Sequence, residues 1–561
     1  MYVESYRRER RDGRVTGVTD TGRDLQMREL MDTMKELRLT IESLRKELSA
    51  RDKLIENLQE QIAYLQKKLF GTSSEKRSLV VEGQLGLFDE VEVEAAKETD
   101  PEPDAGEETV SFTTTKTRKA RTPKEELLKG VPMTEKIIEL PDSERFCQAC
   151  GAEMKPAGKK FIRDEWNFVP AKLTVTRIYA MTYYCPGCKK ESGKKDSNAG
   201  NTLVTAKVPD ALIPHSMATA PVVGHAMYQK YANAVPLYRQ EKDWAQYGAL
   251  LSRSRLARWI NICSNEYFVP VYEYFRRLLL QRGFLMADET RIQVLKEPGR
   301  EAETDSFMWL FRSGEDGLPP IILYGYTETR ARYNAEAFLE GFSGYLMTDG
   351  YQGYNNLPGI TRTCCWAHVR RYFYDAVPQG RKLDYAHPAV QGVVYCDKLF
   401  AIERYCKEHG FTAEQRHDYR LKKASPILAA FWNWLDKLKD YDKGSRLGKA
   451  VQYALNRKPY LETYLEDGRC SLSNNDSENS IRPFCVGRRN WLFSDTPVGA
   501  HASARVYTMV EMAKAHNLNV EDYLVFLLNV RPHADMTDEE LEQLTPWSDA
   551  ARASCAPAFA K

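Results

Sequence analysis

The sequence predicts a multidomain α/β protein, and three observations support that fold class. The first is a long series of apolar residues at heptad spacing near the N-terminus, and the second is a pair of Cys-x-x-Cys motifs. The third is a set of short, strand-like apolar runs from residue 284 onward, in which acidic residues occur at unusual positions. A chain of 561 residues is long enough for several domains of these different kinds.

The composition is typical of an intracellular protein with reduced cysteines. Of the 12 Cys residues, four form the two pairs and the others are scattered without a disulfide framework. The N-terminus is rich in Arg and lacks the apolar segment of a signal peptide, and no apolar run is long enough to span a bilayer. We therefore expect a cytoplasmic protein without a membrane partner. The net charge of +2 does not by itself indicate a nucleic-acid partner.

Residues 1–22 are polar and basic and predict a disordered tail, whereas residues 23–71 predict a leucine-zipper coiled coil. From Met27 to Leu69 an apolar residue recurs at alternating spacings of three and four, and only Arg51 breaks the series. Ile occupies several a positions and Leu most d positions, which favours a parallel two-stranded coiled coil and hence a homodimer. The alternative is one amphipathic helix packed on the globular part of the same chain.

Residues 72–130 predict a disordered linker with an acidic and a basic part. Residues 89–108 contain ten Asp or Glu and one Lys, a composition that cannot build an apolar core. A basic cluster follows, which fits a solvated linker and an arm on DNA phosphates equally well. The cluster consists of Lys116, Arg118, Lys119, Arg121 and Lys124.

The two cysteine pairs predict a zinc-binding ribbon domain in residues 131–205. The ligands expected for Zn²⁺ are Cys147, Cys150, Cys185 and Cys188. Each pair forms a tight knuckle with two thiolates, and two knuckles complete a tetrahedral site. The alternating run 172–179 between the pairs predicts a strand of the ribbon. Unrelated cysteines or a redox pair are the alternatives.

Residues 206–282 predict a helical region whose middle part has the form of a helix-turn-helix. Ser252 can cap a second helix, which presents Arg253, Arg255 and Arg258. The second helix of such a motif enters a DNA groove. A plain helical hairpin explains the same pattern equally well.

Residues 283–374 predict the first part of a catalytic core. We expect strands at 284–295, 307–312, 321–326 and 344–348, with a helix near 335–342. Three strands, a helix and then a strand that ends in an acidic residue form the opening order of a ribonuclease-H-like fold. We expect a helical insertion at 375–470, the last part of the core at 471–500, and a C-terminal helical region and tail at 501–561.

Three acidic residues in this region predict a metal site. Asp288 shares a strand face with apolar side chains, whereas alternation places Glu289 with Arg291 and Gln293 on the other face. A carboxylate among apolar groups requires a metal or another partner, which favours Asp288.

Asp349 taken alone fits an Asp-Gly turn, and Glu478 opens a segment rich in Arg. Together, Asp288, Asp349 and Glu478 predict a site for Mg²⁺ or Mn²⁺, where two ions can cleave or join a phosphodiester.

Further polar residues lie near these acids. Arg482, Arg488 and Arg489 follow Glu478 and fit either salt bridges or contacts to DNA phosphates. Cys365 and His368 have the spacing of metal ligands, but no second pair is close in sequence. Their packing in the interior is therefore the better interpretation.

In this order the motifs resemble those of the DDE transposases of the bacterial insertion sequence 66 family. The resemblance covers about residues 25–528, and a common form of the family's third motif is Asp-Asn-Asn-x-x-Glu-Arg. Here Ser473 replaces its first Asp, and Asn479 replaces its Arg. The other marks are Lys-Lys-Leu-Phe-Gly-Thr-Ser-Ser-Glu-Lys at 67–76, Gln-Leu-Gly-Leu-Phe-Asp-Glu at 84–90, Pro-Leu-Tyr-Arg-Gln-Glu at 236–241, Leu-Ser-Arg-Ser at 251–254, Ala-Asp-Glu-Thr at 287–290, Thr-Asp-Gly-Tyr at 348–351, Cys-Trp-Ala-His-Val-Arg-Arg at 365–371, Arg-Pro-Phe at 482–484 and Gly-Arg-Arg-Asn-Trp at 487–491.

The resemblance implies a function and a set of partners. It implies that Asp288, Asp349 and Glu478 are the catalytic triad of a DNA transposase, which nicks element ends and joins the 3′-hydroxyl to target DNA. It also implies binding to terminal inverted repeats, small accessory transposition proteins and a place at the bacterial nucleoid. Two other classes fit the residues, a non-catalytic DNA-binding regulator and an enzyme that cuts RNA in hybrids.

Overall fold

The computed structural model describes residues 31–49, 51–52, 55, 173–184, 203–378, 384–438 and 441–555. The chain divides into two compact units, which are considered separately. The larger comprises residues 80–368, 396–428 and 457–561, and the smaller comprises residues 1–79, 369–395 and 429–456. The predicted tail, the predicted linker and the four ribbon cysteines lie outside the described residues.

The described part of the predicted zipper is an α-helix over residues 31–49. Its apolar side chains at the a and d positions are exposed, with exposed fractions from 49% for Ile41 to 61% for Leu48. The helical prediction is confirmed for these residues, and the pairing of two such helices stays a prediction.

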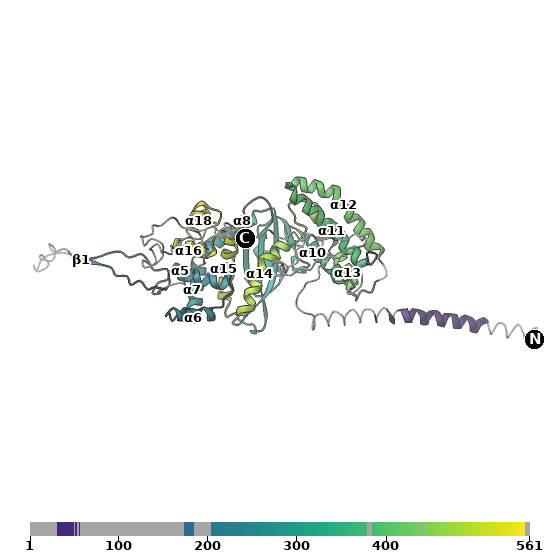
Figure 1. Cartoon of the computed structure of the whole chain (residues 1–561), viewed down its shortest axis with the longest axis horizontal. Helices are drawn as coiled ribbons and strands as arrows, with labels where there is room; N and C mark the ends of the chain where they lie inside the picture. The colour runs from purple at the N-terminus through teal and green to yellow at the C-terminus, as the bar shows by residue number, and fades with distance from the viewer. Residues whose placement is uncertain are drawn as a thin grey trace, which may run out of the picture. The chain divides into compact units, whose positions relative to one another are not determined.

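A mixed sheet forms the centre of the larger unit (Figure 1). Its strand order is β5-β4-β3-β6-β7, and β8 pairs with β3. Strand β3 runs antiparallel to β4 and parallel to β6, β4 runs antiparallel to β5, and β6 runs parallel to β7. The strands are β3 (Phe284–Val294), β4 (Asp305–Ser313), β5 (Ile322–Thr327), β6 (Gly344–Thr348), β7 (Ile360–Cys364) and β8 (Phe493–Ser494).

The sequence predicts four of these strands closely and misses β7 and β8. The predicted helix near 335–342 is present as α9 (Arg332–Phe338). Four consecutive residues at the start of β3, Phe284 to Ala287, are buried, so both faces of the strand are covered there. Asp288 to Thr290 are partly exposed, and Arg291 is exposed.

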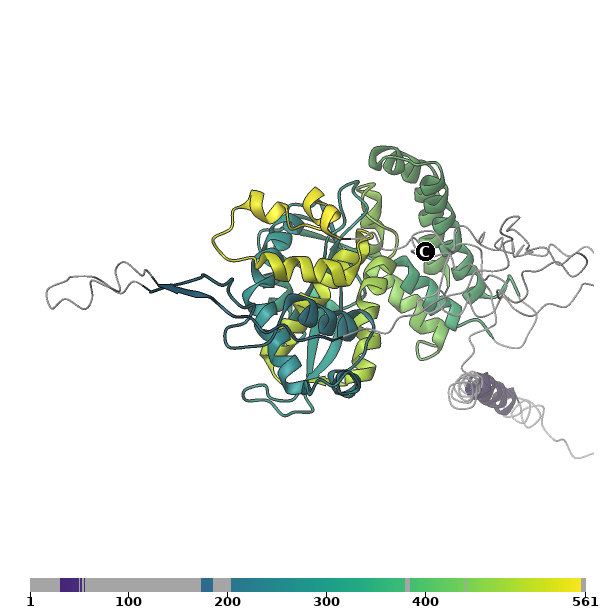
Figure 2. The ribbon, with the colours of Figure 1, turned by 60° about the vertical axis from the view of Figure 1, so that its left-hand side comes forward.

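Helices from both ends of the larger unit pack around the sheet (Figures 1 and 2). Helix α14 (Asn475–Trp491) packs on β3 and β4, and α15 (Pro497–Ala515) packs on β5. Helix α16 (Val520–Val530) lies against α5 (Ala220–Met227), which joins the C-terminal and N-terminal helices of the unit. Helices α17 (Asp538–Glu542) and α18 (Asp549–Ser554) follow, and a 3₁₀ turn, η3, spans Gln352–Tyr354.

The segment before the sheet is helical, as its sequence predicts. After α5 come a π-helix, η2 (Tyr228–Ala232), and helices α6 (Leu237–Gln246), α7 (Arg253–Glu266) and α8 (Phe268–Leu280). Gly248 has φ +82°, a conformation that suits glycine in the turn between α6 and α7. The Ser252 hydroxyl accepts a hydrogen bond from the Arg255 backbone N–H and caps α7 as expected.

The strand expected at 172–179 is not formed in the described residues from 173 onward. Instead, β1 (Thr182–Tyr184) pairs antiparallel with β2 (Leu203–Thr205). Residues 174–181 are exposed, so the alternating pattern there does not pack against a neighbour that would define a sheet face.

Long helices occupy the segment predicted as a helical insertion. They are α11 (Pro388–Glu408), α12 (Ala413–Lys437) and α13 (Arg446–Glu462), and a 3₁₀ turn, η4, spans Thr463–Leu465. Helix α10 (Trp366–Asp375) precedes them, and all but its last residue lies within the segment predicted as the first part of the core. In the smaller unit, aromatic rings of Phe373, Tyr395, Phe431 and Trp434 pack together with centroids 5.5–6.2 Å apart. None of the helices in the described ranges is both long and apolar enough to cross a membrane.

In the larger unit, a fully buried arginine fixes the segment that leads toward α14. The Arg420 guanidinium donates to both oxygens of Glu403, at 2.8 and 2.7 Å. It also donates to the backbone carbonyls of Tyr464, Asp467 and Cys470, at 2.9, 3.1 and 2.8 Å. One side chain thereby satisfies a carboxylate and several buried carbonyl groups.

We expect Arg420→Met to lower the free energy of unfolding by about 3–5 kcal/mol, because it breaks a buried ion pair. Urea unfolding followed by tryptophan fluorescence measures the change. Lys422→Met, at an exposed position of the same helix, is the matched control and should change stability by less than about 0.5 kcal/mol. A similar small loss in both variants would contradict this role of Arg420.

Candidate functional site

Three carboxylates from separate elements face one another in the larger unit. Asp288 lies within β3, Asp349 directly follows β6, and Glu478 lies in the first turn of α14. Strands β3 and β6 are parallel neighbours, so their successive residues bring Asp288 and Asp349 to the same region of the sheet. Helix α14 packs on β3 and brings Glu478 to them, although the residue is far away in sequence.

The charges of these groups act on Asp288. Burial raises the pKa of Asp288 well above its ordinary value, and the neighbouring charges of Glu289, Glu478 and Asp349 raise the pKa further. One hydrogen bond lowers the pKa of Asp288, since the Glu289 backbone N–H donates to Asp288 Oδ1 at 2.8 Å. A divalent cation would relieve the repulsion, and oxygen donors of this kind suit Mg²⁺ or Mn²⁺.

Glu289 is more buried than the alternation along β3 suggests. Its side chain is 1% exposed, and its carboxylate accepts hydrogen bonds from Arg330 and from the Tyr354 hydroxyl. Burial and the charge of Asp349 raise the pKa of Glu289, while Tyr354 and Arg330 act in the opposite direction. The face that alternation assigns to Glu289, Arg291 and Gln293 is therefore covered at Glu289, where Arg330 before α9 and Tyr354 of η3 contact its carboxylate.

Arg330 links the buried Glu289 to the exposed part of the site. Its Nη2 atom lies 3.8 Å from Asp349 Oδ2, and its guanidinium lies 3.6 Å from the centre of the Tyr351 ring. The Tyr351 backbone N–H donates to Asp349 Oδ1 at 2.8 Å. About a third of the Arg330 side chain is exposed. The sequence gives no local signal for this residue, because its partners come from other elements.

Asn474 connects three segments at the base of the site. Its side-chain amide donates to the Ala287 carbonyl at 3.1 Å, next to Asp288. Its backbone N–H donates to Cys365 Sγ at 3.2 Å. The Trp366 N–H donates to the Leu472 carbonyl at 3.0 Å. These bonds hold the start of α14 against the end of β7 and against β3.

The first half of α14 is also anchored on the sheet. The Arg312 guanidinium donates to the Asp476 carbonyl and to the Ser480 hydroxyl, both at 2.8 Å. The Tyr324 hydroxyl donates to the Ser480 carbonyl. Pro483 lies inside the helix, and it has no N–H to donate to the carbonyl four residues before it.

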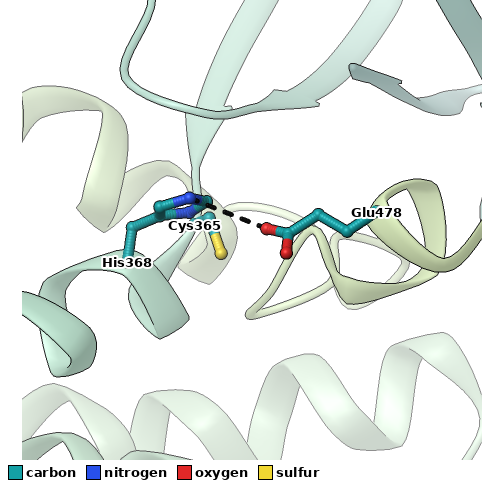
Figure 3. A group of neighbouring side chains, drawn as sticks. All are labelled: Cys365, His368 and Glu478. Carbon is teal, nitrogen blue, oxygen red and sulfur yellow. Dashed lines mark ion pairs between the residues drawn. The ribbon is translucent and has the colours of Figure 1, made fainter. Parts of the chain in front are cut away.

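Cys365 and His368 lie beside Glu478, as Figure 3 shows. His368 Nε2 is 3.7 Å from Glu478 Oε1, and the ligand atoms of all three side chains lie within 4.8 Å of one another. Cys365 is fully buried, which agrees with the prediction that Cys365 and His368 pack in the interior. That prediction did not include Glu478 as their neighbour. Within the described residues, no other three His, Cys or acidic side chains come this close. Glu478 thus lies beside this pair, while its charge also acts on Asp288.

The arginines expected to contact DNA lie in two places. On α7, Arg253, Arg255 and Arg258 are exposed. On α14, Arg482 and Arg488 are partly buried and Arg489 is exposed. The Arg488 guanidinium donates to the Thr290 hydroxyl at 3.2 Å, two residues after Asp288. The structure thus brings Arg488 to the carboxylates, whereas no described hydrogen bond or ion pair joins the α7 arginines to them.

Comparison with known proteins places this site in a family. The model of the "Transposase IS66 family" matches residues 215–502, which include Asp288, Asp349 and Glu478. The "zinc-finger binding domain of transposase IS66" matches residues 144–189, and "Transposase C of IS166 homeodomain" matches residues 57–135. These matches define a transposase with a zinc-binding domain. The chain belongs to the IS66 transposase family.

Three proteins of Sinorhizobium fredii are similar to the chain over much of its length. The uncharacterized protein y4jD is 27% identical over 90% of this chain and 97% of its own length. The uncharacterized protein y4qI is 30% identical over 62% of this chain and 65% of its own length. The uncharacterized protein y4hP is 25% identical over 87% of this chain and 88% of its own length.

We expect Asp288→Asn to become more stable relative to the wild type as pH rises in metal-free buffer. Because the pKa of Asp288 is raised in the folded chain, the folded protein retains a proton that the unfolded chain releases above about pH 3.9. The free energy of unfolding of the wild type therefore falls as pH rises, until the pH passes the raised pKa of Asp288. Asparagine does not titrate, so the variant does not show this decrease.

Urea unfolding at about pH 4 and about pH 7, with a chelator present, measures this linkage. Asp476→Asn, two residues before Glu478 on the same helix, is the control. An equal difference between the Asp288 variant and the wild type at both pH values would exclude a raised pKa.

Proposed function

We propose that the protein nicks the ends of an insertion element and joins the 3′-hydroxyl to target DNA by two-metal-ion phosphodiester transfer. The observation that carries the proposal is the convergence of Asp288, Asp349 and Glu478 on the central strands of a mixed sheet. The strand order β5-β4-β3-β6-β7, with β6 and β7 parallel to β3, supports a ribonuclease-H-like core. Family membership supports transposition over other reactions on DNA.

In this proposal the three carboxylates hold the catalytic ions. Their donor atoms fit a hard divalent cation, and the charges of Asp349 and Glu478 already act on Asp288. Bound Mg²⁺ or Mn²⁺ would activate the attacking oxygen and stabilise the leaving oxygen of the phosphodiester. Asn474 and Arg312 position the chain around the acids through the hydrogen bonds described above.

Arginines around the acids provide phosphate contacts. Arg330 is held by Glu289 and stacked on Tyr351, so it loses little conformational freedom when a phosphate binds beside Asp349. Arg488 is held by Thr290, and Arg482 and Arg489 extend the basic surface of α14. Guanidinium groups suit this role because they bind phosphate oxygens in a bidentate manner.

Other parts of the chain recognise and pair the element ends. The exposed arginines of α7 and a zinc ribbon with Cys147, Cys150, Cys185 and Cys188 as ligands would bind the terminal inverted repeats. The exposed apolar stripe on the helix at 31–49 supports a coiled-coil homodimer, which synapsis of two ends requires. We place this activity at the bacterial nucleoid, together with small accessory transposition proteins.

We expect Asp288→Asn, Asp349→Asn and Glu478→Gln each to lower the rate of Mg²⁺-dependent nicking at least about 10³-fold, since bound metal supplies several kcal/mol of transition-state stabilisation. The substrate is duplex DNA that carries the ends of the host element. Asp476→Asn removes a carboxylate from the same helical turn and should nick at the wild-type rate.

The same assay separates this proposal from the other function classes. Specific binding without cleavage, with accessory proteins present, would identify a DNA-binding regulator. Faster cleavage of RNA in a hybrid than of duplex DNA would identify a ribonuclease. Either result would refute the transposition mechanism.

We expect Arg253→Gln, Arg255→Gln and Arg258→Gln to weaken DNA binding and to reduce the slope of log K against log salt by about 1 each. The lost phosphate contact is independent of base sequence, so specific and random DNA should be affected alike. Fluorescence anisotropy at several salt concentrations measures the slope. Arg552→Gln, an exposed arginine on α18, is the control, and equal slopes in all variants would exclude α7 from the interface.

A further inference from the structure

We propose that Cys365, His368 and Glu478 form a second metal site, which binds a transition-metal ion of the zinc class. The site is distinct from the predicted ribbon site and from the site of the two aspartates, although it shares Glu478 with the latter. Sulfur, imidazole nitrogen and carboxylate oxygen together suit zinc, and a thiolate ligand disfavours Mg²⁺.

The geometry of the three side chains is close to that of a bound ion. Zinc bond lengths space tetrahedral ligand atoms roughly 3.3–3.6 Å apart. His368 Nε2 and Glu478 Oε1 are already 3.7 Å apart, and all three ligand atoms lie within 4.8 Å. The sulfur therefore has to approach by no more than roughly 1.5 Å to complete such a site. Figure 3 shows the three side chains converging from the start of α10 and from α14.

The surroundings of Cys365 resemble those of a metal thiolate. Its sulfur accepts the Asn474 backbone N–H at 3.2 Å. Burial and the charge of Glu478 raise the pKa of the Cys365 thiol to about 12, and the backbone N–H groups of Asn474, His368 and Ala367 oppose that rise. Such N–H groups stabilise sulfur that carries negative charge. Cys364, the preceding residue, is buried too, but its sulfur is directed to the Asp349 carbonyl at 3.7 Å.

The same site provides access and an open coordination position. The His368 side chain is 20% exposed, whereas Glu478 is 8% exposed and Cys365 is fully buried. An ion can therefore enter past the imidazole and keep a fourth position for water, as in zinc sites with three protein ligands. The metal site depends on the proposed transposition function in one respect only: an ion bound here would compete with the catalytic site for Glu478.

Cobalt titration of the full-length protein tests the site without any DNA. Co²⁺ is added to protein isolated with zinc and stripped of loosely bound metal, and absorption is compared with that of Cys365→Ser. We expect a sulfur-to-cobalt charge-transfer band in the wild type, which is lost in Cys365→Ser and in His368→Gln. Competition with a zinc chelator should show at least about 100-fold weaker zinc binding in both variants.

Two matched variants complete the test. Cys364→Ser replaces a buried thiol one residue away, and Asp288→Asn removes a proposed catalytic ligand, yet both should retain the cobalt band. Near-ultraviolet circular dichroism shows that each variant is folded. The same band in the wild type and Cys365→Ser, or its equal loss in Cys364→Ser, would overturn the proposal. The cobalt titration contains no DNA, so its outcome does not depend on whether the protein nicks DNA. The metal-site proposal and the transposition proposal can therefore fail independently.

Discussion

Repulsion between like charges on partly buried carboxylates is the constraint on which the rest of the site depends. Burial raises the pKa of Asp288 in the folded chain, and the charges of Glu289, Glu478 and Asp349 raise it further. A fold keeps such an arrangement only when other contacts offset its cost. Arg330 neutralises Glu289, and Arg312 and Asn474 hold the segments in place. The carboxylates are thus held close together at a cost in stability, which a bound cation would offset.

Asp288, Asp349 and Glu478 all lie within the part of the chain that matches the transposase family, and they meet at one region of the sheet. Strands β3 and β6 supply two acids from neighbouring positions, and α14 supplies the third from a distant part of the sequence. The arginines of α14 then follow the third acid along the same helix, so one element carries both carboxylate and cationic groups. This arrangement explains why motifs scattered over almost 200 residues form a single site.

Local patterns predicted the elements of the core but not their long-range contacts. The segments that form β3 to β6 either alternate apolar and polar residues or are continuously apolar. The observed bounds of these strands agree with the predicted ones within two residues. The burial of Glu289 was missed because it depends on Arg330 and Tyr354, which come from other loops. The group of Cys365 and Glu478 was missed for the same reason. The run at 172–179 failed as a strand prediction, because periodicity does not provide a pairing partner.

Pro483 divides α14 into two parts that are fixed by different neighbours. Before the proline, Arg312 and Tyr324 attach the turn with Glu478 to strands β4 and β5. After it, Arg488 is attached to Thr290 of β3. Because one helical hydrogen bond is missing between them, bending at this joint costs little. The carboxylate of Glu478 and the guanidinium of Arg488 can therefore change position independently of each other.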